Sequence, residues 1–249
     1  MSKTTLQYVH GFHAVEALLK YQPQAVMHVY ILKQRHDMRM KNIMDLALRH
    51  HCQVTKVSRE ELVVMAGEQH QGVIAKITEL SRYLEKDLSA IVENAANNSM
   101  VLVLDQVQDP HNVGACLRSA NAFGVDAVIV PQHHACALTS VARKAASGAD
   151  MITPYIQVTN LARTLRWLKE QHYWLVGLDG QAEQTLLTID LTGKIVFVMG
   201  NEGEGLRRLT REHCDYIVRI EMQGIVESLN VSVATAICLY SKYNYSQMK

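Results

Sequence analysis

Hydrophobic residues recur along the chain in two alternating patterns. Apolar positions three and four residues apart predict helices, whereas short runs rich in Val and Ile predict strands. In the first eighty residues these patterns predict helices over 13–20, 38–50 and 59–66, and strands over 27–32, 54–57 and 73–77. The sequence therefore predicts a small α/β unit with its own core.

From residue 100 the alternation is stronger. The run Met100–Leu104 (MVLVL) is entirely apolar, which is typical of a strand buried in a parallel sheet. Further strands are predicted over 127–130, 174–176, 195–199 and 216–220, and helices over 113–123, 140–147, 161–171, 207–213 and 231–240. This order predicts an α/β fold with an open, mostly parallel sheet.

The polar stretch between the two regions ends in AANNS and is the predicted linker. The predicted organisation is therefore a first domain over 1–79, a linker over 80–99 and a second domain over 100–249.

Composition adds little to this picture except by exclusion. The chain has 249 residues, of which 48% are hydrophobic, and it contains no apolar run of bilayer length and no signal-peptide core. We therefore expect a soluble cytoplasmic protein without a membrane partner. The five cysteines show no CxxC spacing, which disfavours a disulfide framework or a zinc ribbon.

Charge is unevenly distributed although the net charge is only +1. Residues 1–79 carry ten Lys and Arg against seven Asp and Glu, a net of +3, and residues 100–249 carry thirteen against fourteen, a net of −1. If one part of the chain binds a polyanion such as a nucleic acid, this charge distribution indicates the first domain, residues 1–79.

Three polar clusters follow three predicted strands, where ligands bind in open parallel sheets. The first cluster, DQVQDPHNVGACLRSA (105–120), contains Asn112 and Arg118. A simpler role exists for each, since Asn112 would cap the following helix and Arg118 would be a solvated helix charge. The third cluster, IEMQGIVESLNVSVA (220–234), contains Ser228 and Asn230, either of which would cap the helix behind it.

The second cluster, GNEGEGLRR (200–208), is a glycine turn between a strand and a helix. It is neither GxGxxG nor a P-loop, and Glu202 and Glu204 would repel a phosphate. Acidic residues suit a cationic ligand, or one read through its hydrogen-bond donors. The alternative is a plain helix start with acidic residues at the positive end of the dipole.

Taken together, DPHNVGACLRSA, VMGNEGEGL and SLNVSVA resemble the three motifs of the SpoU branch of the SPOUT RNA methyltransferases. The resemblance extends through KAASGA (144–149) and VTNLARTL (158–165), and within the branch it is greatest to bacterial enzymes that methylate a guanosine ribose 2′-hydroxyl of 23S rRNA. Residues 1–79, with GFHAVEALL and HQGVIA, resemble their RNA-binding domain, which is related to ribosomal proteins. One departure is Glu221, where the family often has Pro.

The resemblance implies a trefoil knot near the C-terminus, a homodimer formed through the C-terminal domain, and S-adenosylmethionine as methyl donor without a metal. It assigns chemistry and substrate positioning to Asn112, Arg118, Glu202, Ser228 and Asn230. It assigns cofactor binding to Gly200, Asn201, Ile220, Met222 and Leu229. Because guanidinium holds its proton tightly, we expect Arg118 to stabilise the developing alkoxide rather than act as the base.

Several alternatives are open. A tRNA ribose methyltransferase of the same branch shares the motifs, whereas a non-catalytic RNA-binding relative would be expected to have lost Arg118 or Asn112. A nucleotide-dependent oxidoreductase is disfavoured because the dinucleotide fingerprint is missing. A metal site is disfavoured because the histidines at 10 and 13, 50 and 51, and 133 and 134 lack acidic or cysteine partners at ligand spacing.

Overall fold

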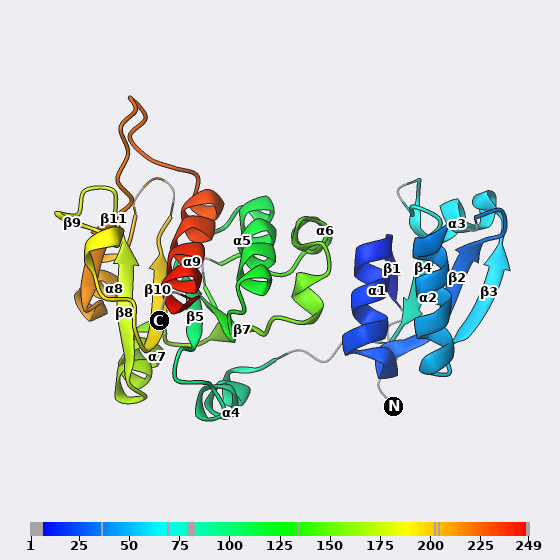
Figure 1. Cartoon of the computed structure of the whole chain (residues 1–249), viewed down its shortest axis with the longest axis horizontal. Coiled ribbons are helices and arrows are strands. Elements are labelled where there is room, and N and C mark those ends of the chain that lie inside the picture. The colour runs from blue at the N-terminus through cyan, green and yellow to red at the C-terminus, as the bar shows by residue number, and fades with distance from the viewer. Residues whose placement is uncertain are drawn as a thin grey trace. The chain divides into compact units, whose positions relative to one another are not determined.

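The chain folds into two compact units in the computed structural model, which describes residues 7–35, 37–68, 70–78, 83–133, 135–201, 203 and 205–247 (Figure 1). The first unit comprises Met1–Ser81 together with Ser147–Ile152, and the second comprises Arg82–Ala146 and Thr153–Lys249. The short segment Ser147–Ile152 interrupts the second unit in sequence, and its Met151 is buried in the core of the first.

The first unit is built on a four-stranded sheet in the order β1-β4-β2-β3, in which only the β2–β3 pair is parallel. One face is covered by two helices and the other carries a single short helix. Asp37 caps the second helix, and Ser58 with Glu61 forms a capping box on the third. The elements are β1 (Gln7–His10), α1 (Phe12–Tyr21), β2 (Val26–Leu32), α2 (Met38–Arg49), β3 (Gln53–Val57), α3 (Arg59–Ala66) and β4 (Val73–Ile77), with 3₁₀ turns at Pro23–Ala25 and, from the later segment, Ala149–Met151.

The second unit is built on a seven-stranded sheet in the order β7-β6-β5-β10-β8-β11-β9, and every pairing in it is parallel. Its strands are β5 (Met100–Leu104), β6 (Ala127–Pro131), β7 (Tyr155–Val158), β8 (Tyr173–Leu178), β9 (Gln184–Thr185), β10 (Lys194–Met199) and β11 (Tyr216–Arg219). Its helices are α4 (Leu88–Glu93), α5 (Pro110–Ala122), α6 (Ser140–Ala146), α7 (Leu161–Glu170), α8 (Arg208–His213) and α9 (Val231–Gln247), with 3₁₀ turns at Glu85–Asp87 and Leu186–Thr188.

The predicted α/β fold with a mostly parallel sheet is confirmed. All five residues of β5 are buried, as its uninterrupted apolar run predicted. The sequence pattern missed β1, β7 and β9, because β1 and β7 have four residues each that mix polar with apolar, and β9 has only two, both polar. Part of the stretch 80–99 folds with the second unit, because Leu88 and Val92 of α4 are buried in its core.

The position of β10 determines where a ligand can bind. This strand lies between β5 and β8, both of which precede it in the chain. Since all the strands are parallel, the loops that leave β5, β8, β10 and β11 emerge at one edge of the sheet. Helix α9 packs against α5 and β10 beside that edge.

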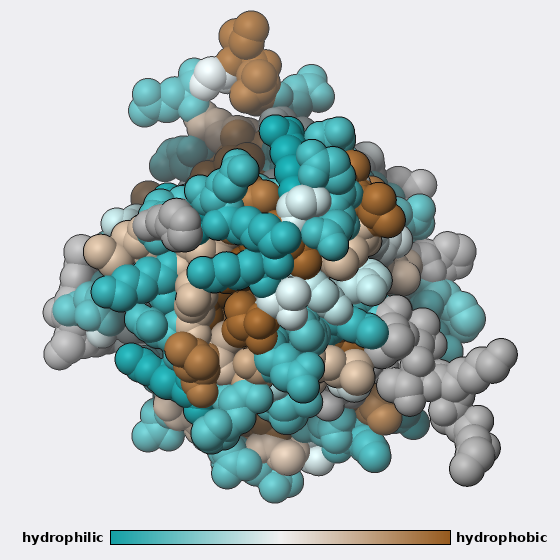
Figure 2. Space-filling model, turned by 90° about the vertical axis from the view of Figure 1, so that its right-hand side faces the viewer, coloured by the Kyte–Doolittle hydropathy of each residue, from teal (hydrophilic) through white to brown (hydrophobic). Residues whose placement is uncertain are grey.

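The part of the surface seen in Figure 2 is mainly hydrophilic, with hydrophobic residues in small separate groups. The loop between β11 and α9 projects from the second unit (Figure 1), and its Ile225 and Val226 are 102% and 59% exposed. Within the described residues, no helix is both long and apolar enough to cross a membrane.

Candidate functional site

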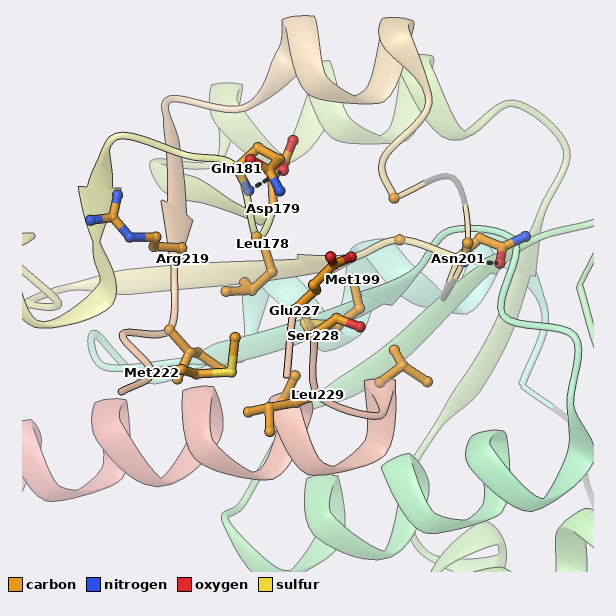
Figure 3. A pocket seen from close by; sticks show the side chains of 17 residues that line it. Leu178, Asp179, Gln181, Met199, Asn201, Arg219, Met222, Glu227, Ser228 and Leu229 are labelled. Carbon is orange, nitrogen blue, oxygen red and sulfur yellow. Dashed lines mark hydrogen bonds between the residues drawn. The ribbon is translucent and has the colours of Figure 1, made fainter. Parts of the chain in front are cut away.

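A cavity of about 410 Å³ opens at the carboxyl edge of the second unit's sheet. Its walls come from the loops after β8, β10 and β11, from the segment before α9 and from the first turn of that helix (Figure 3). Small-molecule sites in proteins usually measure about 300–1,000 Å³. The cavity is therefore large enough for a nucleoside-sized ligand, and parallel topology brings its distant segments together.

The loop after β10 forms a closed turn. The backbone N–H of Asn201 donates to the carbonyl of Gly205 and that of Gly205 donates to the carbonyl of Asn201, both at 3.0 Å. The Asn201 side chain accepts a further bond of 3.0 Å from the N–H of Gly203. A Cβ on Gly200 would lie 2.3 Å from the carbonyl carbon and oxygen of Gly205, so only glycine permits this close approach.

Asp105, directly after β5, anchors the other side of this loop. Its side chain is fully buried and accepts bonds from the Thr210 hydroxyl at 2.6 Å and from Nε of Arg207 at 3.0 Å. Nη2 of Arg207 lies 2.6 Å from the second carboxylate oxygen. The N–H of Asp105 also donates to the carbonyl of Met199 at 2.8 Å. The carboxylate thus joins the ends of β5 and β10 to the start of α8.

The cavity wall mixes apolar and polar side chains. Of the two carboxylates that the described residues contribute to it, Asp179 pairs with Arg211, whereas Glu227 has no cationic partner in the described part of the chain. Among the described residues, the wall contains one guanidinium, that of Arg219, which donates hydrogen bonds to backbone carbonyls, including that of Glu183 at 2.6 Å. Glu227 is thus the carboxylate of the described wall that is left to attract a positively charged group of a ligand.

All five residues predicted to bind the cofactor line the cavity, as does Ser228 from the predicted chemical set (Figure 3). They are Gly200, Asn201, Ile220, Met222, Leu229 and Ser228. Glu202 lies outside the described residues, as does Glu204. Leu178–Gln181 and Glu227 also line the cavity and were missed by the sequence analysis. The sequence LDGQ places a polar turn directly after an apolar strand, which is the same feature that identified the other clusters.

Asn112 and Asn230 contact each other beside the cavity. Nδ2 of Asn230 donates to Oδ1 of Asn112 at 3.0 Å, although 118 positions separate them. The capping alternative for Asn112 is wrong, because Asp109 caps α5 and Asn112 lies buried in its first turn. Asn230 does cap α9, since its Oδ1 accepts from the N–H of Ser232 at 2.9 Å. The pair fastens the start of α9 to the start of α5.

Arg118 is not brought into the cavity. It lies exposed on α5 and is absent from the cavity wall. The structure of a single chain therefore brings together the predicted cofactor residues, Ser228 and the Asn112–Asn230 pair, and leaves Arg118 apart.

Two further groups of side chains bear on the chemistry of the second unit. Within the described ranges, no group of three or more His, Cys, Asp or Glu side chains is placed to bind a metal ion. Burial raises the pKa of the Cys214 thiol to about 12, which keeps it protonated near neutral pH and thus a poor nucleophile.

Comparison with known proteins identifies the family. Residues 99–240 match the SpoU rRNA Methylase family, and residues 8–83 match the family described as RNA 2'-O ribose methyltransferase substrate binding. The chain belongs to the SpoU rRNA methylase family. The resemblance found in its three motifs is thereby confirmed.

Relatives and solved structures agree with this assignment. This SpoU chain is 46% identical to the 23S rRNA (guanosine-2'-O-)-methyltransferase RlmB of Coxiella burnetii, over 96% of this chain and 95% of that protein. It is 49% identical to RlmB of Haemophilus ducreyi, over 94% and 96% of the two chains.

Two solved structures are similar over both units. The crystal structure of an RNA 2'-O ribose methyltransferase matches with a TM-score of 0.76 at 25% identity, covering 97% of this chain and 89% of that one. The SpoU methyltransferase AviRb of Streptomyces viridochromogenes, in complex with the cofactor AdoMet, matches with a TM-score of 0.76 at 23% identity, covering 97% and 91%. The fold of the whole chain is thus that of SpoU methyltransferases.

The Asp105 cluster yields a stability prediction. Asp105→Ala leaves Thr210 and Arg207 without their buried acceptor, and we expect the free energy of unfolding to fall by about 1–3 kcal/mol. Urea unfolding measures this change. The matched control is Glu212→Ala, which breaks an exposed ion pair between Glu212 and Arg208 on the same helix α8 and should change the stability by no more than about 0.5 kcal/mol. Equal effects of the two substitutions would contradict the anchoring role.

Proposed function

We propose that this protein transfers a methyl group from S-adenosylmethionine to a guanosine ribose 2′-hydroxyl of 23S rRNA. The observation that carries the proposal is the cavity at the sheet edge, whose walls are made by two of the SpoU motifs and which the third motif joins through Asn112 and Asn230. The relatives named 23S rRNA (guanosine-2'-O-)-methyltransferase match both units of the chain, which supports the choice of RNA and nucleoside. Such a substrate is consistent with a cytoplasmic location.

The cavity residues fit S-adenosylmethionine. This molecule carries a methyl group on a positively charged sulfonium and a second positive charge on its amine, and it reacts without a metal. Glu227 supplies negative charge, and the apolar side chains of Met222 and Leu229 suit the adenosine. Gly200, Asn201, Ile220, Met222 and Leu229 would hold the methyl donor, with the closed turn at Gly200 keeping that wall fixed.

The protein's own contribution is alignment and charge stabilisation. Holding two reactants in a near-attack geometry lowers a barrier by up to about 7–11 kcal/mol. The guanidinium of Arg118 would bind the RNA phosphate and stabilise the developing ribose alkoxide, while the proton leaves to water or to a phosphate oxygen. Ser228 and the Asn112–Asn230 pair would position the ribose, and Glu202 would orient Arg118.

A homodimer formed through the second unit would bring Arg118 to a shared site. Helix α9 exposes Val233 (48%), Tyr240 (54%) and Tyr243 (44%), which is unusual for a helix that also packs on its own sheet. The rings of Tyr240 and Tyr243 lie with centroids 5.9 Å from that of Phe123, next to the end of α5. An apolar surface that includes the helix of Arg118 supports an interface at this place.

We also propose that the C-terminal region forms the trefoil knot that the family resemblance implies. The insertion of β10 between two earlier strands supports it, as does the meeting of the loops after β10 and β11 at one cavity. An experimental trace of residues 195–247 tests the proposal, because a backbone that can be pulled straight from both ends would contradict it.

The two units would divide the work, with residues 1–79 binding the RNA and residues 100–249 binding the donor and carrying out transfer. The match of residues 8–83 to a substrate-binding family supports this division, as does the net charge of +3 in residues 1–79. Substitutions in the first unit should then alter RNA affinity without altering donor affinity.

The proposed reaction is tested with an unmodified 23S rRNA transcript and radiolabelled S-adenosylmethionine. We expect one ribose methylation, located at a guanosine, and donor binding by calorimetry in chelator-treated buffer. NAD serves as the control ligand and should not bind. Methylation of a tRNA transcript in place of the rRNA would favour the tRNA enzyme, and donor binding without transfer to the transcript, to precursor particles or to tRNA would favour a non-catalytic relative.

Arg118 provides the sharpest test of the mechanism. Losing one preorganised donor to an oxyanion costs about 10²–10³ in rate. We expect Arg118→Ala to lower single-turnover methyl transfer by that order while fold and donor affinity stay near normal. Arg118→Lys should rescue little, because a point charge does not reproduce the planar two-pronged contact. Arg166→Ala on α7, also exposed, is the control and should transfer normally. Near-normal transfer by Arg118→Ala would make Arg118 an ordinary surface charge.

The dimer interface is tested at Tyr240. Tyr240→Asp buries an unpaired charge if α9 lies in an interface, so we expect light scattering to report a monomer at micromolar concentration and methyl transfer to be lost. Tyr21→Asp, which changes a 58% exposed tyrosine of the first unit, should leave the dimer intact. A fully active monomer in the unsubstituted protein would refute both the dimer and the shared site.

A further inference from the structure

One face of the first unit's sheet is only partly covered. Side chains alternate along each strand, and Val9, Val29 and Ala75 pack toward α1 and α2. Their neighbours therefore lie on the opposite face, where the strand register sets Tyr8 opposite Lys76 and Lys76 opposite His28. The result is a row of an aromatic, a cationic and a second aromatic side chain across β1, β4 and β2.

Helix α3 covers only one end of that face. Its Leu62 packs against Ile74 and Val57, with Tyr30 at the margin of this cluster. Tyr8 is 42% exposed, although a tyrosine on a sheet face usually has its ring covered. The row Tyr8–Lys76–His28 therefore lies on the part of the face beyond the α3 cluster.

Two of the rings on this face, those of His28 and Tyr30, are held in fixed orientations. The two rings are stacked, with centroids 4.4 Å apart and planes inclined by 19°. Nε2 of His28 is hydrogen-bonded to the Thr55 hydroxyl of β3 at 2.8 Å. Rings fixed on a sheet lose little conformational entropy when a ligand stacks on them.

The chemistry of this row fits unpaired RNA. Bases of single strands stack on aromatic rings, and phosphates are attracted to lysine. The row ends at Gln53, which lies opposite His28 on β3. Its side chain is neutral and therefore does not repel the phosphates of an RNA strand. A duplex would not use the rings, because its bases are already stacked.

We propose that Tyr8, His28, Tyr30 and Lys76 form a base-stacking surface that binds a single-stranded segment of the RNA substrate. The proposal rests on the proposed function and adds to it the place and the manner in which the first unit recognises RNA. These side chains would determine RNA affinity. They come from a different part of the sequence than the residues of the proposed methyl-donor cavity, and they would take no part in methyl transfer.

The test measures binding of the full-length protein to the 23S rRNA transcript and to a short oligoadenylate. Stacking contributes enough per base that Tyr8→Ala should weaken both affinities by between about fivefold and about a hundredfold, whereas Tyr8→Phe keeps the ring and should restore them. Lys76→Gln should lower the slope of log affinity against log salt concentration by about one. For methyl transfer we expect a raised KM and an unchanged kcat.

Matched controls lie on α1 and α2. Tyr21→Ala and Lys41→Gln remove an exposed aromatic and an exposed cation outside this row, and both should bind RNA within about twofold of the unsubstituted protein. Donor affinity and the unfolding temperature monitor folding, and His28→Ala provides a second ring removal if Tyr8→Ala is unstable.

The outcomes separate this proposal from the proposed function. Oligoadenylate binding that is equal in the unsubstituted protein, Tyr8→Ala and His28→Ala would overturn the stacking surface, whatever the methylation result. Ring-dependent oligoadenylate binding by a protein that methylates no rRNA would support the stacking surface and refute the 23S rRNA assignment.

Discussion

The buried carboxylate of Asp105 is the interaction on which the candidate site depends most. The carboxylate accepts hydrogen bonds from the Thr210 hydroxyl and from the Arg207 guanidinium, and the backbone N–H of Asp105 donates to the carbonyl of Met199 at the end of β10. A carboxylate with no solvent contact is costly unless every such partner is present. The loop from Gly200 to Leu206 is therefore held between two fixed points, the end of β10 and Arg207.

This constraint holds the cavity wall in a fixed arrangement. The turn between Asn201 and Gly205 closes on itself, and the approach of Gly205 to Gly200 leaves no space for a side chain. On the other side, the Asn112–Asn230 contact fixes the start of α9. A wall fixed in this way orients a ligand without ordering loops during binding, which preserves binding energy for alignment.

The two units have different physical designs that suit different tasks. The second buries a parallel sheet and collects its loops at one edge, which suits a small molecule. The first has a mostly antiparallel sheet with one face partly open, which suits an extended polymer. The segment Ser147–Ile152 contributes Met151 to the first unit's core although its neighbours in sequence belong to the second, so the two units are not independent along the chain.

The sequence by itself determined the fold class, most elements and many of the residues that line the cavity. Uninterrupted apolar runs such as Met100–Leu104 identify buried strands, and polar clusters directly after them identify the ligand edge. The five cofactor residues were predicted on motif resemblance, and all of them line the cavity.

Only the tertiary structure decided which polar residues meet. Asn112 and Asn230 lie 118 positions apart, and in the sequence each could be explained locally as a helix cap, an explanation that holds only for Asn230 in the structure, so the sequence had no means to pair them. No local sequence pattern indicated the role of Asp105, because its partners, Arg207 and Thr210, are more than a hundred positions away. Strand order is set by packing among distant segments, and no local pattern records that β10 lies between β5 and β8.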